Sequence, residues 1–197
     1  MKNTLRFLTV IIAAAVIYSC GGSVGEESKV ESSGSRPDWI FKPTTKDNQY
    51  VLVTGEMTKS KDRAFGMNQA YADGVRKLLN MMINDVKTQS SQVLRGSNVE
   101  EGDVEKYSEF AVAWISQTYT IANVENPETY WEKVKVDTPY GETYYYDCYS
   151  RVRITRGDFN KSLTGAFESM RKRARDDNKK TVEDVAEKLI EDLNNGK

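Results

Sequence analysis

Histidine is absent from this 197-residue sequence, so the side chain best suited to acid–base chemistry near neutral pH is missing. The sequence also has no glycine-rich phosphate loop, no ligand spacing typical of a metal site and no nucleophile elbow. We therefore expect no catalytic residue, no cofactor and no metal. A carboxylate pair of the kind used by glycosidases stays open as an alternative, because the 29 acidic residues need only meet in space.

Cysteine is scarce and occurs only at positions 20 and 148. Cys148 lies within the aromatic run 144–149, where we expect a small buried side chain. A reactive thiol would need a basic neighbour to lower its pKa, and the chain has no histidine. If Cys20 carries a lipid, no intramolecular disulfide can form.

An excess of charge of either sign is also missing, because 28 basic residues accompany 29 acidic ones and the net charge is -1. Nucleic-acid phosphates attract strongly basic proteins, so we do not expect a nucleic-acid partner. The 39% hydrophobic content is ordinary for one globular domain. The part of the chain after the first forty residues is long enough to bury a core without disulfides or metals.

The N-terminal apolar run is too short to cross a membrane. From Phe7 to Ile17 it would form a helix of about 16 Å, roughly half the thickness of a 30 Å hydrocarbon core. A short basic stretch precedes it, and this layout is typical of a secretory signal peptide, here residues 1–19. The run ends on Ile17-Tyr18-Ser19-Cys20, which resembles the lipobox of bacterial lipoproteins.

The lipobox resemblance implies that Cys20 receives a diacylglyceryl group, becomes the mature N-terminus and is then acylated, for example with palmitate. Cysteine suits this chemistry because its thiolate is the best side-chain nucleophile near neutral pH. Two or more acyl chains anchor a protein stably, so we expect Cys20 to hold the body beside a membrane. The alternative is an ordinary signal peptide followed by a coincidental cysteine. The resemblance also favours the outer membrane, because no aspartate follows Cys20, but it leaves open which face the protein occupies.

Residues 20–36 are rich in glycine, serine and glutamate and nearly free of large apolar side chains. Such a segment buries too little apolar surface to offset the entropy of ordering it. We therefore predict a flexible tether between the lipidated cysteine and the folded body.

A core domain is expected at residues 37–157, opening with an extended arm that packs Trp39 on the core rather than displaying it. The β-branched run 50–56 predicts the first strand. From Ser60 the apolar spacing becomes that of one long helix, which should end between residues 90 and 96.

Three small residues of this helix, Gly66, Ala70 and Gly74, form a stripe on one side. Each glycine inside a helix costs about 1 kcal/mol relative to alanine. That cost is easiest to understand if the helix backbone approaches a sheet closely at this stripe.

The region after the long helix begins with an acidic loop at 96–102, whose acids lack the spacing of a calcium site. Helical spacing then predicts a second helix from Asp103. Residues 119–124 and 129–136 are strand-like, and we expect one long strand bent near Pro127.

A turn at 137–142 leads into an alternating strand at 142–155. The alternation predicts a hairpin with one buried and one solvent-exposed side. Cys148 belongs to the first side and Tyr149 to the second.

Residues 158–197 are expected to be a C-terminal helical extension. The pattern predicts an N-cap at 157–158 and a last helix from Thr181. The basic cluster 171–175 is expected to be a solvated helical surface, and contact with anionic lipid headgroups is the alternative.

Taken in order, the lipobox, Pro37-Asp38-Trp39, Tyr50–Gly55, the small-residue helix and Tyr149–Ile154 resemble the LPP-twenty family of bacterial lipoproteins. The similarity covers about residues 36–165. It implies an α+β fold in which one long helix crosses a three-stranded antiparallel sheet in a dodecin-like arrangement, with the C-terminal helices added. Some family members are associated with the outer membrane, flagellar assembly or host contact, and the resemblance implies no catalytic residues.

The function we expect is that of a non-catalytic envelope lipoprotein, held on a membrane by its lipid and contacting an envelope protein partner. The main alternative is a lipoprotein that binds a small molecule or glycan on an aromatic sheet face. The aromatic residues that would line such a face are Trp114, Tyr119, Trp131 and the tyrosines of 144–149. The oligomeric state and the physiological process stay open.

Overall fold

The structure is a computed structural model that describes residues 24–118 and 123–195. These residues form five strands, four α-helices and one 3-10 helix. They are β1 (Glu27–Ser32), the 3-10 helix η1 (Asp38–Phe41), β2 (Thr44–Lys46), β3 (Tyr50–Ser60), α2 (Arg63–Gly96), α3 (Glu101–Thr118), β4 (Glu125–Thr138), β5 (Gly141–Thr155), α4 (Arg156–Asp176) and α5 (Lys180–Asn194). The expected α+β class is confirmed.

The sheet of the described residues has five antiparallel strands in the order β1-β4-β5-β3-β2, so the expected number of three is wrong. The two additional strands are short and lie at the two edges. Most side chains of β1 are exposed, so this strand is held mainly by backbone pairing with β4. Because apolar patterning reports burial and not backbone pairing, it gave no signal for such an edge strand.

The same finding corrects the predicted tether. Residues 27–32 are not a flexible linker but strand β1, with Glu27 opposite Val136 and Ser32 opposite Glu132. Cys20 and the predicted signal peptide 1–19 lie outside the described residues.

The long helix α2 has the small-residue contact that its sequence predicted. Gly55 of β3 lies so close to α2 that a Cβ atom on it would fall 2.0 Å from the Ala70 carbonyl oxygen. On the same stripe, a Cβ on Gly74 would lie 3.1 Å from the Val152 methyl groups of β5. Asp62 caps the helix by accepting a 2.7 Å hydrogen bond from the Phe65 amide. The face of the sheet that contacts α2 is called the inner face below, and the opposite face the outer face.

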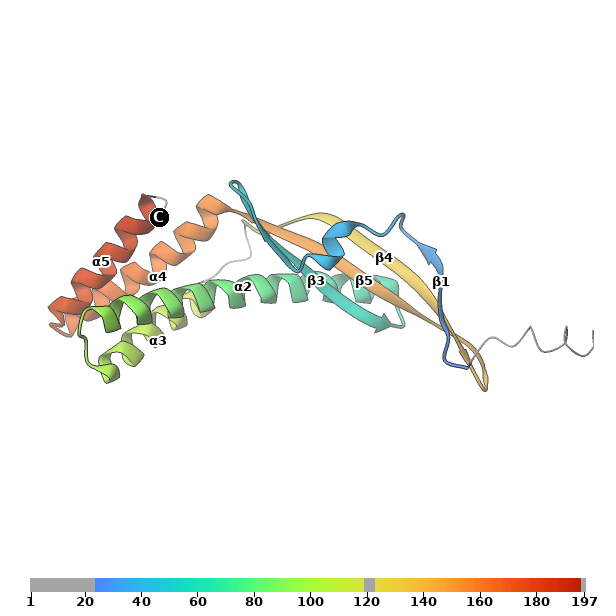
Figure 1. The fold of residues 1–197 in the computed structure, drawn as a ribbon, viewed down its shortest axis with the longest axis horizontal. Helices are drawn as coiled ribbons and strands as arrows, with labels where there is room; N and C mark the ends of the chain where they lie inside the picture. Colours follow the sequence, from blue (N-terminus) through green and yellow to red (C-terminus); the bar gives the residue numbers. More distant parts are fainter. Residues whose placement is uncertain (1–23, 119–122, 196–197) are drawn as a thin grey trace, which may run out of the picture.

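The second half of α2 extends beyond the sheet and packs with α3, α4 and α5 in a helical bundle (Figure 1). A 34-residue helix is about 51 Å long, which is enough to contact both the sheet and the bundle. Sheet residues such as Val53 and Val152 belong to the same buried cluster as Phe167 and Leu189 of the bundle. The C-terminal helices therefore pack on the core and do not extend away from it.

Three details of the predicted boundaries change. Helix α4 begins at Arg156, and its N-cap is Thr155, whose hydroxyl accepts a 3.0 Å hydrogen bond from the Asp158 amide. Helix α5 begins at Lys180 without a side-chain cap. Strand β4 begins at Glu125, later than predicted, and its pairing with β5 is irregular between Glu125 and Glu128, the region where the bend near Pro127 was predicted. Residues 119–122 of the predicted strand lie outside the described part of the chain.

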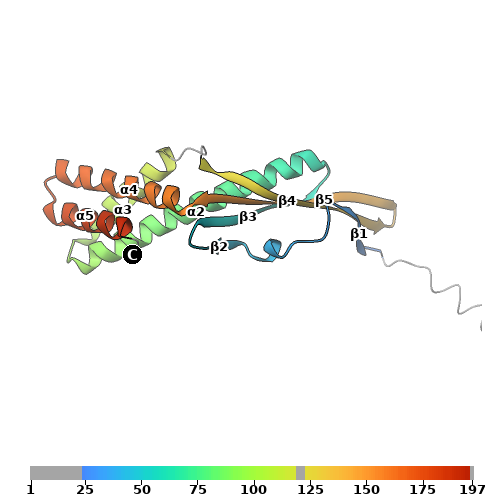
Figure 2. The same ribbon diagram turned by 90° about the horizontal axis from the view of Figure 1, so that it is seen from above.

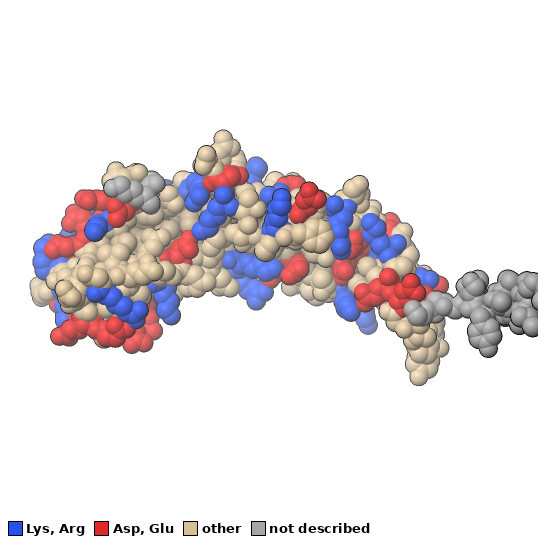
Figure 3. Space-filling model, viewed as in Figure 1, with Lys and Arg blue, Asp and Glu red and all other residues tan. Residues whose placement is uncertain are grey.

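The described body is elongated, with the sheet at one end and the bundle at the other (Figure 2). The chain enters at the sheet end, beside the turn that joins β4 and β5 (Figure 1). Basic and acidic side chains are interspersed over the face drawn in Figure 3. None of the helices in residues 24–118 and 123–195 combines the length and the apolar character of a membrane span.

Candidate functional site

The outer face of the sheet carries a network of charged and aromatic side chains, which is our candidate functional site. Strand β4 places Tyr130 and Glu132 on this face, and β5 places Asp147 and Tyr149 directly opposite them. Side chains two positions apart in a strand point to the same face, so each strand places its two residues together. The pairing register then brings two carboxylates, those of Glu132 and Asp147, to neighbouring positions.

Glu132 is buried, with 5% of its surface exposed, and is held by two donors. The Arg36 guanidinium forms an ion pair with one of its oxygens. The Tyr130 hydroxyl donates a 3.0 Å hydrogen bond to the other. Burial lowers the pKa of Arg36, but Glu132, Tyr149 and Tyr130 together outweigh that effect, so the net shift is upward and the guanidinium stays charged. A buried carboxylate needs such partners, because an unpaired buried charge is strongly destabilising.

Asp147 is half-buried beside this pair, and its pKa is raised. Burial is the largest cause, and the carboxylates of Glu132 and Glu27 act in the same direction. The Lys59 amide opposes the shift by donating a 2.9 Å hydrogen bond to Asp147 Oδ1. Two acids with different environments are the arrangement that carboxylate catalysis uses. Three grooves in the described part of the chain lie beside helices α2 to α5, and neither Glu132 nor Asp147 lines any of them. None of these three grooves can therefore bring a substrate to this pair.

The network instead fastens the N-terminal arm to the sheet. Trp39 of η1 is 6% exposed and packs with Tyr130 and Tyr149 on the outer face. Its carbonyl accepts a 3.1 Å hydrogen bond from the Thr54 hydroxyl of β3. The prediction that Trp39 is packed and not displayed is confirmed. Arg36, three residues earlier, adds the ion pair to Glu132.

The aromatic residues predicted to line a binding face lie on separate surfaces. Trp131 and Tyr146 contact each other on the inner face with ring centroids 6.0 Å apart, and the Arg63 guanidinium lies 4.7 Å from the Trp131 ring. Tyr145 and Tyr149 lie on the outer face and are buried. Trp114 belongs to the bundle, and Tyr119 lies outside the described residues. The structure therefore does not bring this set together.

Cys148 is fully buried on the inner face, against Gly66 of α2. Burial raises the pKa of its thiol to about 11, so the thiolate is scarce at neutral pH. Its sulfur lies 3.8 Å from the Arg63 carbonyl oxygen. The prediction of a small buried side chain is confirmed.

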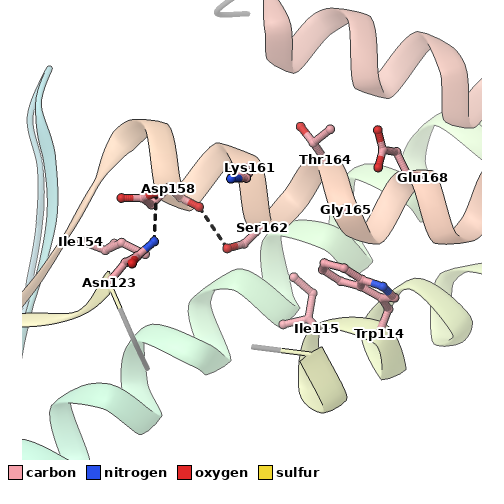
Figure 4. A pocket seen from close by; sticks show the side chains of 10 residues that line it. All are labelled: Trp114, Ile115, Asn123, Ile154, Asp158, Lys161, Ser162, Thr164, Gly165 and Glu168. Atoms are coloured by element: carbon pink, nitrogen blue, oxygen red, sulfur yellow. Dashed lines mark hydrogen bonds between the residues drawn. The ribbon is translucent and has the colours of Figure 1, made fainter. Parts of the chain in front are cut away.

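A groove of about 480 Å³ lies between α3 and α4 (Figure 4). Trp114 forms one wall and packs so closely on Gly165 that a Cβ there would lie 2.2 Å from its ring. Asp158 accepts a 3.1 Å hydrogen bond from the Asn123 amide, and its carbonyl accepts one of 3.0 Å from the Ser162 hydroxyl. With one aromatic among the described lining residues, this groove differs from the aromatic-lined site that the ligand-binding alternative requires.

The basic cluster 171–175 is a paired helical surface. Among its ion pairs and those of residues 179–180, two join α4 to α5, one joins the turn after α4 to α3, and two are local i,i+4 pairs. They are Arg171–Glu187 at 4.0 Å, Arg173–Asp177 at 3.3 Å, Arg175–Glu183 at 2.8 Å, Lys179–Asp103 at 2.7 Å and Lys180–Asp184 at 2.9 Å. Exposed pairs of this kind contribute little each, about 0 to 1 kcal/mol. Among the described residues, no group of three His, Cys, Asp or Glu side chains is arranged to hold a metal ion.

Sequence reasoning missed the network of Arg36, Glu132 and Asp147. Arg36 and Glu132 are 96 positions apart, and the arm that carries Arg36 lacks a periodic pattern. The alternation of β4 was the one available signal, because it places Glu132 on the same side as Tyr130.

Comparisons of this chain with models of known protein families, with curated proteins and with solved structures found no match.

Proposed function

We propose that the protein is a bacterial envelope lipoprotein, anchored through lipid on Cys20, whose folded body is a non-catalytic protein-interaction module. The anchor is supported by the signal-peptide layout and by the lipobox-like residues 17–20. On the same resemblance, the membrane is the outer membrane. The LPP-twenty resemblance and its dodecin-like arrangement belong to this proposal, and the crossing of β3 and β5 by α2 supports them.

The proposal rests on the place where the N-terminal segment joins the folded body. Strand β1 begins seven residues after Cys20 and lies at one end of an elongated body (Figure 1). A lipid on Cys20 would therefore hold one end of the body near the membrane and leave the bundle at the other end accessible to a partner. The outer-face network supports this role, because Arg36 and Trp39 fasten the arm to the sheet and make the attachment firm.

The anchor is tested by expressing the full chain and a Cys20→Ser variant in a diderm bacterium and partitioning each between detergent and aqueous phases. We expect the parent protein in the detergent phase and the variant in the aqueous phase or retained as precursor. Ser23→Ala, which leaves residues 17–20 intact, is the matched control and should behave as the parent. Equal partitioning of the parent and Cys20→Ser would contradict the anchor.

The interaction role is tested by crosslinking in the native envelope followed by mass spectrometry. We expect crosslinks from bundle lysines to one recurrent envelope protein in the parent strain, with their loss in the Cys20→Ser strain. Crosslinks that are unchanged in the variant would contradict a role that depends on the anchor.

A further inference from the structure

The turn between β4 and β5 displays a fully exposed tyrosine. Tyr140 is 100% exposed, and the turn that holds it is well defined: the Thr138 hydroxyl donates a 2.6 Å hydrogen bond to the Gly141 carbonyl, and the Tyr140 amide donates one of 3.3 Å to that hydroxyl. Gly141 has a φ of 120°, a value that side-chain-bearing residues rarely adopt. We call residues 138–141 the hairpin tip. Its backbone geometry needs the glycine but does not need an aromatic side chain at position 140.

The N-terminal chain leaves the body at this same end. The Gly25 amide donates a 2.7 Å hydrogen bond to the Asp137 carbonyl, next to the hairpin tip. Because β1 is antiparallel to β4, the chain before β1 continues in the direction of the tip. Val24, 68% exposed, and Tyr144, 45% exposed, add apolar surface to this end.

Covalent geometry limits how far the membrane can be from the tip. Five residues separate Cys20 from Gly25, and a fully extended chain of that length spans about 18 Å. Thr138 lies one strand step, about 3.4 Å, beyond Asp137, and the turn residues Pro139 and Tyr140 project further in the same direction. The tip therefore projects toward the side on which the anchor holds the membrane.

The chemistry of the tip suits the headgroup layer and not a charged surface. Residues 138–141 carry no charge. The Nζ atom of the nearby Lys135 forms ion pairs with carboxylate oxygens of Asp137 and Glu142, each at 3.1 Å. Tyrosine is enriched where membranes meet water, because its ring is apolar and its hydroxyl is polar. With no free basic cluster at the tip, the contact would depend on the ring and on the anchor and not on anionic lipid.

We propose that Tyr140 inserts into the lipid headgroup layer of the membrane that carries the anchor. The hairpin tip then contacts the membrane, and the helical bundle points away from it. This inference rests on the proposed lipidation of Cys20. It adds an orientation and a second membrane contact to the anchor.

The test uses the full lipidated protein in vesicles of phosphatidylethanolamine and phosphatidylglycerol that contain a lipid brominated near the headgroup. An environment-sensitive fluorophore is attached through Pro139→Cys, which leaves Tyr140 in place. The matched control carries the label through Glu100→Cys, an exposed position at the bundle end of α2. The buried Cys148 should remain unlabelled in the folded protein. Vesicle flotation is measured for every sample.

We expect quenching of the label at position 139 and none at position 100. Adding Tyr140→Ser to the Pro139→Cys protein should reduce that quenching. Three results would overturn the inference while leaving the anchor intact: floating protein without quenching at 139, equal quenching at both positions, or quenching at 139 that Tyr140→Ser leaves unchanged. Failure of the parent protein to float would overturn the anchor and, with it, this inference.

Discussion

The contact between Gly55 and α2 gives the sharpest prediction about the fold. In a Gly55→Ala variant, the new Cβ would lie 2.0 Å from the Ala70 carbonyl oxygen and 2.3 Å from the Gly74 amide nitrogen. Both obstacles are backbone atoms, so no side chain can rotate away, and the helix must move by more than an ångström from the sheet. Overpacking typically costs about 1 to 3 kcal/mol, and we expect about 3 kcal/mol or more here.

The matched control is Gly74→Ala, on the opposite side of the same contact. Its Cβ would meet the Val152 methyl groups at 3.1 Å and the Gly55 amide nitrogen at 3.3 Å, which small shifts can relieve. Alanine also gains about 1 kcal/mol over glycine inside a helix. The two effects oppose each other, so we expect a change within about 1 kcal/mol.

Urea and thermal unfolding, followed by circular dichroism, measure these differences. For a chain of this size, 3 kcal/mol corresponds to a fall in Tm of about 6 to 12 °C. If Gly55→Ala unfolded at the same midpoint as the parent protein, the close approach of β3 and α2 would be refuted. If Gly74→Ala were the more damaging of the two, the assignment of the obstacle to the helix backbone would be refuted.

Two further predictions concern titratable groups. The pKa of Asp147 is higher in the folded protein than its usual value of 3.8. Its charged form therefore lowers the stability of the fold when the pH is above the folded pKa. This cost disappears as the pH falls toward 3.8. Asp147→Asn keeps an acceptor for the Lys59 amide, so it should be more stable than the parent at neutral pH, with a difference that shrinks on acidification; a difference that grows on acidification would contradict the shift. The Cys148 thiol, with a pKa of about 11, should resist a thiol reagent in the native protein and react once urea unfolds it, and fast native labelling would contradict its burial.

The sequence predicted the elements that bury a periodic apolar face. Helix α2 was recognisable from its 3.6-residue spacing and small-residue stripe, and the β4–β5 hairpin from its alternation and turn residues. Their burial explains the success, because hydrophobic periodicity records which side of an element faces the core.

What the sequence could not predict depends on backbone pairing and on distant partners. Strand β1 carries charged residues and buries little, so its composition was that of a linker, yet the edge of β4 offers its backbone hydrogen-bonding partners. The outer-face site depends on the pairing of Glu132 with Asp147 and on the return of Arg36 from the N-terminal arm. The first contact depends on the exact register of the hairpin, and the second has no local signal.

The proposed lipid on Cys20 would hold this body at a membrane, and the intact mass of the mature protein tests that anchor most directly. Protein purified from the membrane fraction should have lost residues 1–19 and should carry a diacylglyceryl group and an amide-linked acyl chain on Cys20. A mature chain with an unmodified Cys20, or one that retains residues 1–19, would contradict the claim.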